Sequence, residues 1–158
     1  MTKIYFAGPL FNDAERDFNL KLTLELEREG FEVFLPQRDG VESTKEEYAY
    51  LPKEEKRKIM FAVDRDRILQ ADIFLFILDG RVPDEGACVE LGIAYHQKYS
   101  NFQDKIIIGL QTDKRAAFIS AKLNPMIACS LDHLFFSSNE LKNFLVKNLK
   151  AENLAPNL

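Results

Sequence analysis

Ile73-Phe74-Leu75-Phe76-Ile77-Leu78 is the longest uninterrupted apolar run in this sequence. A strand with one wet face alternates apolar and polar residues, so a continuous run indicates a strand that is covered on both faces. The stretch 106–110, Ile-Ile-Ile-Gly-Leu, repeats the pattern. Both runs are far shorter than the roughly 20 residues that a membrane-spanning helix needs. They predict two central strands of a parallel sheet.

The segments around these two runs alternate between strand and helix. Apolar runs and helical spacing predict further strands at 3–7, 31–35 and 133–136, and helices at 14–29, 53–70, 86–98 and 139–149. Residues 37–52 have no sustained period and are predicted to form a surface loop. The stretch from Gln111 to Asn124 is predicted to be rich in loops, and 151–158 to be a polar tail. We therefore predict an α/β fold: a doubly wound, flavodoxin-like open parallel sheet of about five strands with helices on both faces.

Length and charge narrow the function classes. A chain of 158 residues with 46% hydrophobic content has the size of one domain, so 1–158 is predicted to be a single domain. The net charge of -4 gives no electrostatic footprint for a polyphosphate backbone, so no nucleic-acid partner is expected. The first residues lack the apolar region of a signal peptide. We expect a soluble, cytoplasmic protein with no membrane partner.

Most cofactor and nucleophile chemistries lack their usual signatures. Cys88 and Cys129 form no C-x-x-C pair, and His96 and His133 are the only histidines, so we expect no metal site. Neither a phosphate-binding loop nor a dinucleotide-binding G-x-G-x-x-G occurs, and we expect no cofactor. No G-x-S-x-G motif is present either. Carboxylate chemistry remains.

The segment 79–95 carries the two most informative carboxylates. Glu90 is the one charged residue between Gly86 and Tyr95, and nearly every other position in this stretch is apolar or small. A carboxylate on such a helix either has an internal partner, is protonated, or faces a polar cavity. Asp84 stands six residues earlier, at the turn from strand to helix, so both side chains could face one pocket above the strand ends. On spacing alone, Asp84 fits an N-cap as well as a site residue, and Glu90 fits a structural salt bridge as well as catalysis.

Two ordered motifs resemble those of the nucleoside 2-deoxyribosyltransferases. Residues 3–11, Lys-Ile-Tyr-Phe-Ala-Gly-Pro-Leu-Phe, look like the opening strand and loop of that family. Residues 84–94 look like its D-x-G-x-x-x-E-x-G-x-A segment. Asp64, eight residues before Asp72, falls where the family has a pocket Asp or Asn, and 124–127 resembles the late N-x-M segment.

The resemblance implies a pentosyltransferase that exchanges the base of 2'-deoxyribonucleosides for a free nucleobase. It implies that Glu90 is the nucleophile, which forms a covalent deoxyribosyl ester with retention over two displacements. Tyr5 would hydrogen-bond and orient Glu90. Asp84 would hold the sugar 5'-hydroxyl, and Asp64 would face the base and manage its proton.

The same resemblance implies the remaining substrate contacts. Gly8 lies in the first loop, and Phe11 and Gln37 would contact the base by stacking and hydrogen bonding. Asn124, with Met126 in the same segment, would enter a neighbouring subunit's pocket, which implies a homo-oligomer, either a dimer or a hexamer. Without the resemblance, these side chains fit ordinary core, loop and turn positions.

Two other functions fit the same motifs. Relatives with this fold hydrolyse 2'-deoxynucleoside 5'-monophosphates, and there a Ser typically stands six residues before the nucleophile, where this chain has Asp84. A non-catalytic nucleoside-binding module would use Glu90 as a ligand contact only. The chain also ends in Ala-Pro-Asn-Leu rather than in the family's aromatic C-terminus, so the resemblance implies nothing for 151–158.

Overall fold

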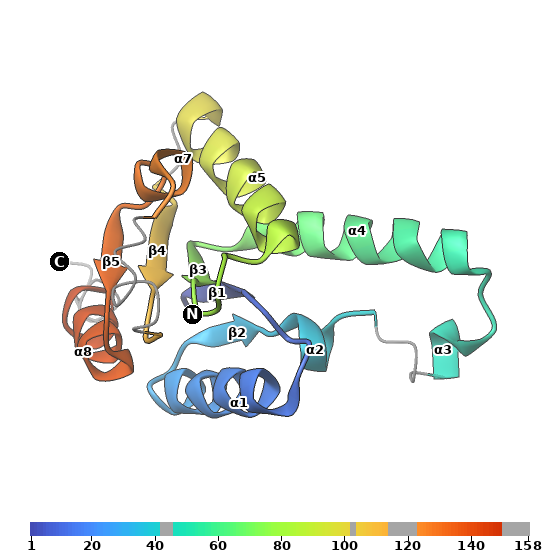
Figure 1. Ribbon diagram of the computed structural model, residues 1–158, viewed down its shortest axis with the longest axis horizontal. Helices are drawn as coiled ribbons and strands as arrows, with labels where there is room; N and C mark the ends of the chain where they lie inside the picture. Colours follow the sequence, from blue (N-terminus) through green and yellow to red (C-terminus); the bar gives the residue numbers. More distant parts are fainter. Residues whose placement is uncertain (42–45, 102–103, 114–122, 150–158) are drawn as a thin grey trace, which may run out of the picture.

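The sheet has five parallel strands in the order β2-β1-β3-β4-β5 (Figure 1). A computed structural model describes residues 1–41, 46–101, 104–113 and 123–149. The strands are β1 (Lys3–Ala7), β2 (Glu32–Phe34), β3 (Ile73–Ile77), β4 (Ile106–Leu110) and β5 (His133–Phe135). The two continuous apolar runs form β3 and β4, and β3 is buried along its whole length. The predicted doubly wound parallel sheet is confirmed.

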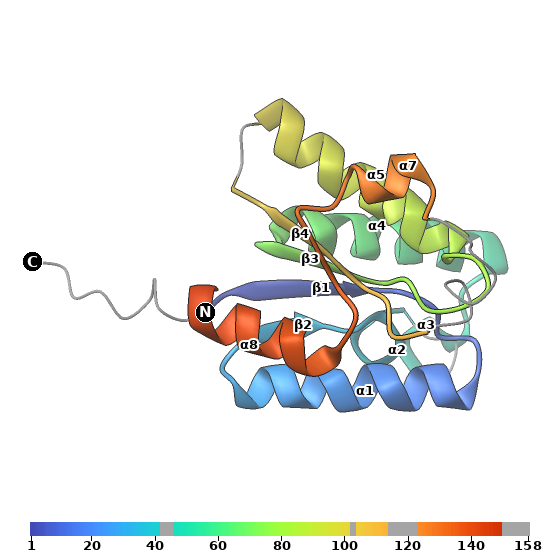
Figure 2. The same cartoon turned by 60° about the vertical axis from the view of Figure 1, so that its left-hand side comes forward.

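Helices cover both faces of the sheet (Figure 2). On one face, α1 (Asp13–Arg28) and α8 (Ser138–Leu149) pack leucines against the strands. On the other face lie α4 (Lys53–Gln70), α5 (Glu85–Asn101) and the short α7 (Pro125–Ala128). Each layer buries one side of the strands, which explains why the central strands are apolar at every position.

Strand β1 places Tyr5 on the α4 and α5 side of the sheet. Successive side chains of a strand point to opposite faces, and Ile4 and Phe6 join the cluster under α1 and α8. Tyr5 and Ala7 therefore join the cluster under α4 and α5. This alternation orients the Tyr5 hydroxyl toward the helix that carries Glu90.

The predicted loop at 37–52 is wrong in part. It contains most of α2 (Pro36–Asp39) and all of α3 (Glu46–Ala49), and a similar short helix, α7, follows Asn124. Helices of four residues are too short to show a helical period, so sequence spacing does not reveal them. Positions 42–45 and 114–122 of the predicted loops and the predicted tail at 151–158 lie outside the described residues.

Helix α4 is less buried than its sequence predicts. Its apolar positions Ile59, Met60, Val63, Ile68 and Leu69 are candidates for core contacts by their helical spacing, but of these five only Ile68 is fully buried. Met60 and Leu69 are 41% and 40% exposed. Figure 1 shows the reason: the N-terminal part of α4 extends past the edge of the sheet, so no strand lies beneath it.

Helix α5 also has exposed apolar residues. Ala87, Leu91 and Ala94 are buried, but Val89 is 61% exposed and Tyr95 38%. One face of α5 packs on the sheet, and the apolar residues on the other face are uncovered in this single chain. None of the helices in the described part of the chain is long and apolar enough to span a membrane.

Candidate active site

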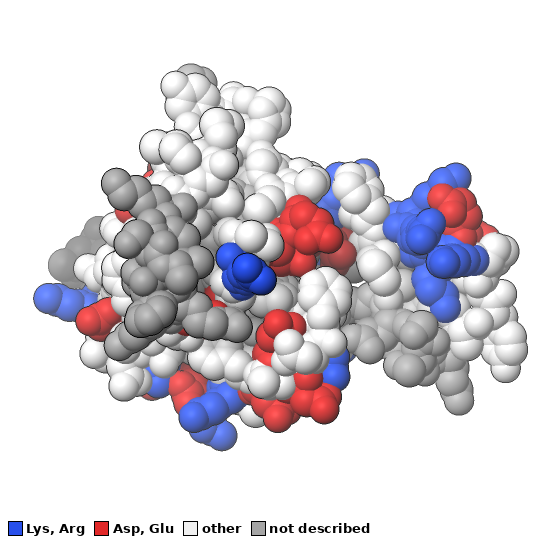
Figure 3. Space-filling view, in the orientation of Figure 1, with Lys and Arg blue, Asp and Glu red and all other residues white. Residues whose placement is uncertain are grey.

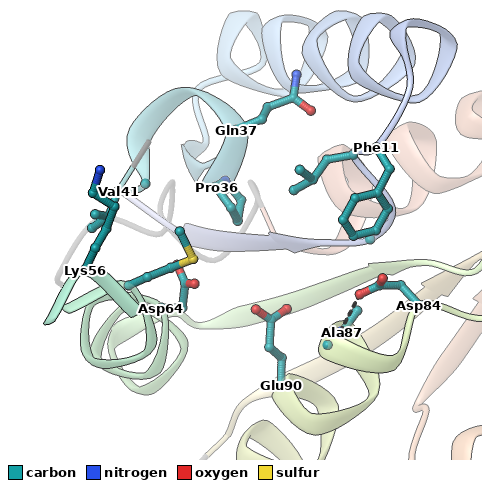
Figure 4. Close-up of a pocket in the computed structure, with 14 residues that line it drawn as sticks. Phe11, Pro36, Gln37, Val41, Lys56, Asp64, Asp84, Ala87 and Glu90 are labelled. Carbon is teal, nitrogen blue, oxygen red and sulfur yellow. Dashed lines mark hydrogen bonds between the residues drawn. The ribbon is translucent and has the colours of Figure 1, made fainter. Parts of the chain in front are cut away.

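A cavity of about 400 Å³ opens above the carboxyl ends of β1, β2 and β3 (Figure 4). In a doubly wound sheet this edge is where ligands bind, because the loops that follow the strands meet there. The cavity is lined by Gly8, Leu10, Phe11, Pro36, Gln37, Gly40, Val41, Lys56, Met60, Asp64, Asp84, Gly86, Ala87 and Glu90.

Gly8 lets the loop after β1 pass close to β3. Its φ is +154°, and a Cβ atom at this position would lie 2.8 Å from Cβ of Ile77. Any larger residue would force the loop away from the sheet. Gly8 therefore fixes the floor of the cavity at its β1 end.

Glu90 and Tyr5 form the central contact of the cavity. The Tyr5 hydroxyl donates a 2.7 Å hydrogen bond to Oε1 of Glu90, across 85 positions of sequence. Tyr5 is fully buried and Glu90 is half-buried. Because the hydroxyl binds one carboxylate oxygen, it fixes the orientation of the group. No hydrogen bond from the described residues reaches the other oxygen, Oε2, which can therefore contact a ligand in the cavity.

Burial and nearby charges shift the pKa values of this pair. The pKa of Glu90 is raised to about 7, mainly because the group is buried; the Tyr5 hydrogen bond lowers the pKa, and the charges of Asp64 and Asp84 contribute to raising it. Burial and the Glu90 carboxylate raise the pKa of Tyr5, which therefore stays a hydrogen-bond donor. Burial also raises the pKa of Asp64, to about 6. The cavity thus holds carboxylates that can exchange protons near neutral pH.

Asp84 acts as an N-cap and also lines the cavity. Its Oδ1 accepts a 2.7 Å hydrogen bond from the backbone N–H of Ala87, in the first turn of α5. Both interpretations of the sequence are therefore compatible with its position. Within the described ranges, Oδ2 of Asp84 accepts no protein hydrogen bond, so it is available to a ligand hydroxyl.

Helix α4 supplies a wall that the sequence reasoning found only in part. Asp64 was expected to line the pocket, whereas Met60 and Lys56, four and eight residues earlier, were missed. Helical spacing places all three on one face, so a search at i-4 and i-8 from Asp64 would have found them. In Figure 4, Asp64 lies on one side of Glu90, and Asp84 and Phe11 lie on the other.

Phe11 and Gln37 both line the cavity, but they differ in how accessible they are to a ligand. Phe11 is 73% exposed at the mouth, so its ring is accessible for stacking. The Gln37 amide is already engaged: Nε2 donates to the carbonyl of Arg16 at 2.9 Å, and Oε1 accepts from Asn19 at 3.2 Å. One N–H and one lone pair remain for a ligand.

Asn124 and Met126 are not brought into this cavity. The Asn124 side chain caps α7 by accepting a 2.9 Å hydrogen bond from the backbone N–H of Met126. Both residues are exposed, and Met126 is 80% exposed. Neither lines the pocket of its own chain.

The charge around the cavity is mostly acidic. Figure 3 shows acidic side chains near the middle of this face, with a mixed basic and acidic group over the far end of α4. The described residues contain no group of three or more His, Cys, Asp or Glu side chains that could hold a metal ion. An ionised carboxylate that is buried and oriented by a phenol can act as a nucleophile at a carbon that develops positive charge.

Comparison with known proteins identifies the family of this chain. The family model for nucleoside 2-deoxyribosyltransferase matches residues 4–149. Among solved structures, the 2-deoxyribosyltransferase of Bacillus psychrosaccharolyticus is 25% identical, with a TM-score of 0.73, over 99% of this chain and 100% of that one. A conserved protein from Enterococcus faecalis V583 is 24% identical, with a TM-score of 0.74, over 94% of this chain and 99% of that one, which shows a shared fold. The search of curated proteins gave no match.

The family match covers nearly the whole chain, and the first of these structures is a characterised 2-deoxyribosyltransferase. These findings support nucleoside 2-deoxyribosyltransferase activity and imply nucleosides and bases as substrates. The chain belongs to the nucleoside 2-deoxyribosyltransferase family.

Proposed function

We propose that this protein exchanges the nucleobase of 2'-deoxyribonucleosides through a covalent deoxyribosyl ester on Glu90. The observation that carries the proposal is the 2.7 Å hydrogen bond from Tyr5 to Glu90 inside a cavity of about 400 Å³. The family match and the characterised relative support the activity, and the contacts of Glu90 support its role as nucleophile.

The first displacement forms the ester. An oxygen of Glu90 attacks C1' while the bond from C1' to the base nitrogen breaks, and the bonding electron pair leaves with the base. Asp64, whose pKa is raised to about 6, supplies a proton to the departing base. The carboxylates of the cavity stabilise the positive charge that develops on the sugar.

The second displacement releases the new nucleoside. A ring nitrogen of the incoming base attacks C1' from the side that the first base left, and the bond to Glu90 breaks with its electron pair returning to the carboxylate. Asp64 accepts the proton that the incoming base loses. Two inversions at C1' give net retention, and no proton or electron is left unbalanced.

The remaining residues bind the two halves of the substrate. Asp84 Oδ2 accepts the sugar 5'-hydroxyl, Phe11 offers an aromatic face for the base, and Gln37 has one donor and one acceptor site left to offer it. Gly8 keeps the floor of the cavity close to the sugar. The proposed substrates need no cofactor.

Base exchange tests the nucleophile directly. A deoxynucleoside incubated with a different free base should give the new deoxynucleoside, and Glu90→Ala should abolish the product. The matched control is Glu85→Ala, an exposed position in the first turn of the same helix, which should keep most of the activity. A 2-fluoro-substituted nucleoside should modify the peptide that contains Glu90, as read by mass spectrometry. Exchange that survives Glu90→Ala would contradict the assignment.

Hydrolysis of nucleoside 5'-monophosphates is the competing activity. A carboxylate at position 84 would repel a phosphate by about 4 kcal/mol per pair of unit charges 4 Å apart at an effective dielectric near 20. Deoxynucleosides should therefore react faster than their monophosphates, and Asp84→Ser should narrow the difference. Faster cleavage of monophosphates by the native chain would favour the hydrolase. Binding of nucleosides with neither exchange nor hydrolysis would favour a binding module.

A homo-oligomer is the second part of the proposal. A groove of about 340 Å³ lies between α4 and α5, and its apolar members include Phe61, Val89 and Ile93. Phe61 is 56% exposed and Val89 61%. The groove shares Asp64 and Glu90 with the cavity, so a second copy of the chain seated there would cover the site. Asn124, the exposed N-cap of α7, and Met126 within α7 would enter the neighbouring pocket.

A further inference from the structure

Tyr5 is held between two phenylalanines from the neighbouring strands. The Phe34 ring in β2 stacks on Tyr5 with centroids 5.6 Å apart and planes 19° apart, and the Phe74 ring in β3 stacks on the other side at 5.8 Å and 7°. Both are directly paired with Tyr5 in the ladder of the sheet. A ring between two parallel rings cannot turn out of plane or slide without losing contact on both sides.

The two sides of this sandwich differ. Phe74 is fully buried at the centre of the sheet. Phe34 is half-buried near the sheet edge, and the guanidinium of Arg67 from α4 lies 5.3 Å from its ring centroid. The cation covers the outer face of Phe34, which keeps that ring against Tyr5. Phe34 does not line the substrate cavity, so any effect it has on the reaction must pass through another residue.

We infer that Phe34 is a positioning residue that holds the Tyr5 hydroxyl in line with Oε1 of Glu90. The inference deepens the proposed function, because it takes Glu90 to be the nucleophile. The rings of Phe34, Tyr5 and Phe74 form one layer on the α4 and α5 side of the sheet, and the Tyr5 hydroxyl leaves that layer toward Glu90.

The alignment of the Tyr5 hydroxyl affects the pKa of Glu90. The groups that shift the pKa of Glu90 are the Tyr5 hydroxyl from β1, Asp64 from α4 and Asp84 from the loop before α5. Three cations of α4 also line the spaces around Glu90: Lys56 in the cavity, and Arg57 and Arg65 in the adjoining groove between α4 and α5. Burial and the two carboxylates raise the pKa of Glu90, and within the described part of the chain the Tyr5 hydrogen bond is the one interaction that lowers it. A looser Tyr5 ring therefore leaves Glu90 protonated to a higher pH, where it cannot attack C1'.

The test replaces Phe34 and follows the pH dependence of base exchange. Phe34→Leu removes the ring but keeps an apolar side chain, and we expect kcat to fall about three- to ten-fold with KM little changed. The acid limb of the kcat profile should move up by about half a pH unit. Phe34→Tyr keeps the aromatic ring, so kcat and the acid limb of its pH profile should both stay at their native values. Phe31→Leu, on the opposite face of the sheet, controls for lost packing and should leave the acid limb in place.

A double-mutant cycle shows whether Phe34 acts through Tyr5. Tyr5→Phe removes the hydroxyl and should give the larger shift of the acid limb. In that background Phe34→Leu should produce no further shift. The inference would be overturned if Phe34→Leu shifted the acid limb equally in the native chain and in Tyr5→Phe, or if it shifted the acid limb in neither.

A second readout separates this inference from the proposed reaction. The Glu90 side-chain carboxyl, labelled with ¹³C and assigned with Glu90→Gln, reports its titration by NMR without turnover. Phe34→Leu should raise that titration midpoint, and an unchanged midpoint would overturn the positioning role. If the native chain exchanges no base while the midpoint moves as expected, the reaction fails and the positioning role stands.

Discussion

Glu90 sits among groups that nearly all oppose its charge. Burial, Asp64 and Asp84 favour the protonated form, and the Tyr5 hydroxyl favours the carboxylate. The result is a pKa of about 7, close to the point where a carboxyl group is both ionised and basic enough to attack. Because Asp64 also titrates near neutral pH, the two carboxylates share their protons as a coupled pair.

The pH dependence of exchange follows from this pair. We expect kcat/KM to fall as the pH drops below about 7, because Glu90 takes up a proton. Asp64→Asn removes a charge that raises the pKa of Glu90, so the acid limb should move to lower pH. The same variant loses the proton donor, so the rate should fall most for bases that leave poorly. Initial rates across pH 5–9 measure both effects, and an acid limb that moves upward would contradict the assignment.

Two substitutions separate the structural and ligand roles of Asp84. Asparagine is as good an N-cap as aspartate, so Asp84→Asn should leave thermal stability nearly unchanged. Asp84→Ala loses the cap and should cost about 1 kcal/mol of unfolding free energy. Both variants should raise KM for deoxynucleosides, because the 5'-hydroxyl loses its carboxylate. Thermal melts and initial rates measure the two properties, and an unchanged KM in both variants would leave Asp84 as a cap only.

The sequence predicts some properties of the individual site residues and not others. The composition of 86–95 indicated that Glu90 faces a partner or a cavity, and the structure gives it both. The composition could not identify Tyr5 as that partner, because the two positions are far apart in sequence and only the sheet joins them. The resemblance to the family supplied Tyr5, Asp64 and Asp84 as one set.

Among the secondary-structure elements, α4 ends in an unusual cap. The buried Lys105 ammonium donates to the carbonyl of Ile68 at 2.8 Å and also to that of Ala71. The Gln97 amide, from α5, donates to the carbonyl of Leu69 at 2.9 Å. Three carbonyls at the C-terminal end of the helix therefore have side-chain donors, which fixes the end of α4 on the sheet.

This cap predicts a pH-dependent stability. Burial lowers the pKa of Lys105 from 10.5 to about 8, so between these values the unfolded chain binds more protons than the folded one. The free energy of unfolding of the native chain, relative to Lys105→Met, should therefore rise as the pH goes from 8 to 10.5, by up to about 3 kcal/mol. Urea denaturation across this range measures the difference. The control is Lys58→Met, which replaces an exposed lysine. If the free energy of unfolding depended on pH in the same way in both variants, the prediction would be wrong.

The elements that the sequence predicts well are those with a strong pattern. Continuous apolar runs predicted β3 and β4, and helical spacing over 14–29 predicted α1 to within one residue at each end. The boundaries of β2 and β5 were predicted one or two residues too wide. The exposure of α4 could not be predicted, because an apolar stripe looks the same whether it faces a sheet or another subunit.

For the molecule as a whole, the proposed oligomer is open to a direct test. Phe61→Ser places a hydroxyl in the groove between α4 and α5, so it should weaken assembly and lower exchange per chain at least about ten-fold at low protein concentration. Phe136→Ser changes a similarly exposed phenylalanine outside the groove and should leave both unchanged. Sedimentation and initial rates at matched concentrations measure the effect. A native chain that is monomeric and fully active would contradict the oligomer.

The residues that line the cavity lie on two kinds of structure, the sheet with its packed helix α5 and the part of α4 that extends beyond the sheet. Tyr5 and Glu90 are joined by a hydrogen bond between β1 and the face of α5 that packs on the sheet. Asp64, Met60 and Lys56 lie on α4, whose outer half extends past the sheet. Under the proposed function, substitutions in the outer turns of α4 should change the range of accepted bases and leave the Tyr5–Glu90 pair intact. Directed evolution of the range of accepted bases therefore has a natural starting point in this helix.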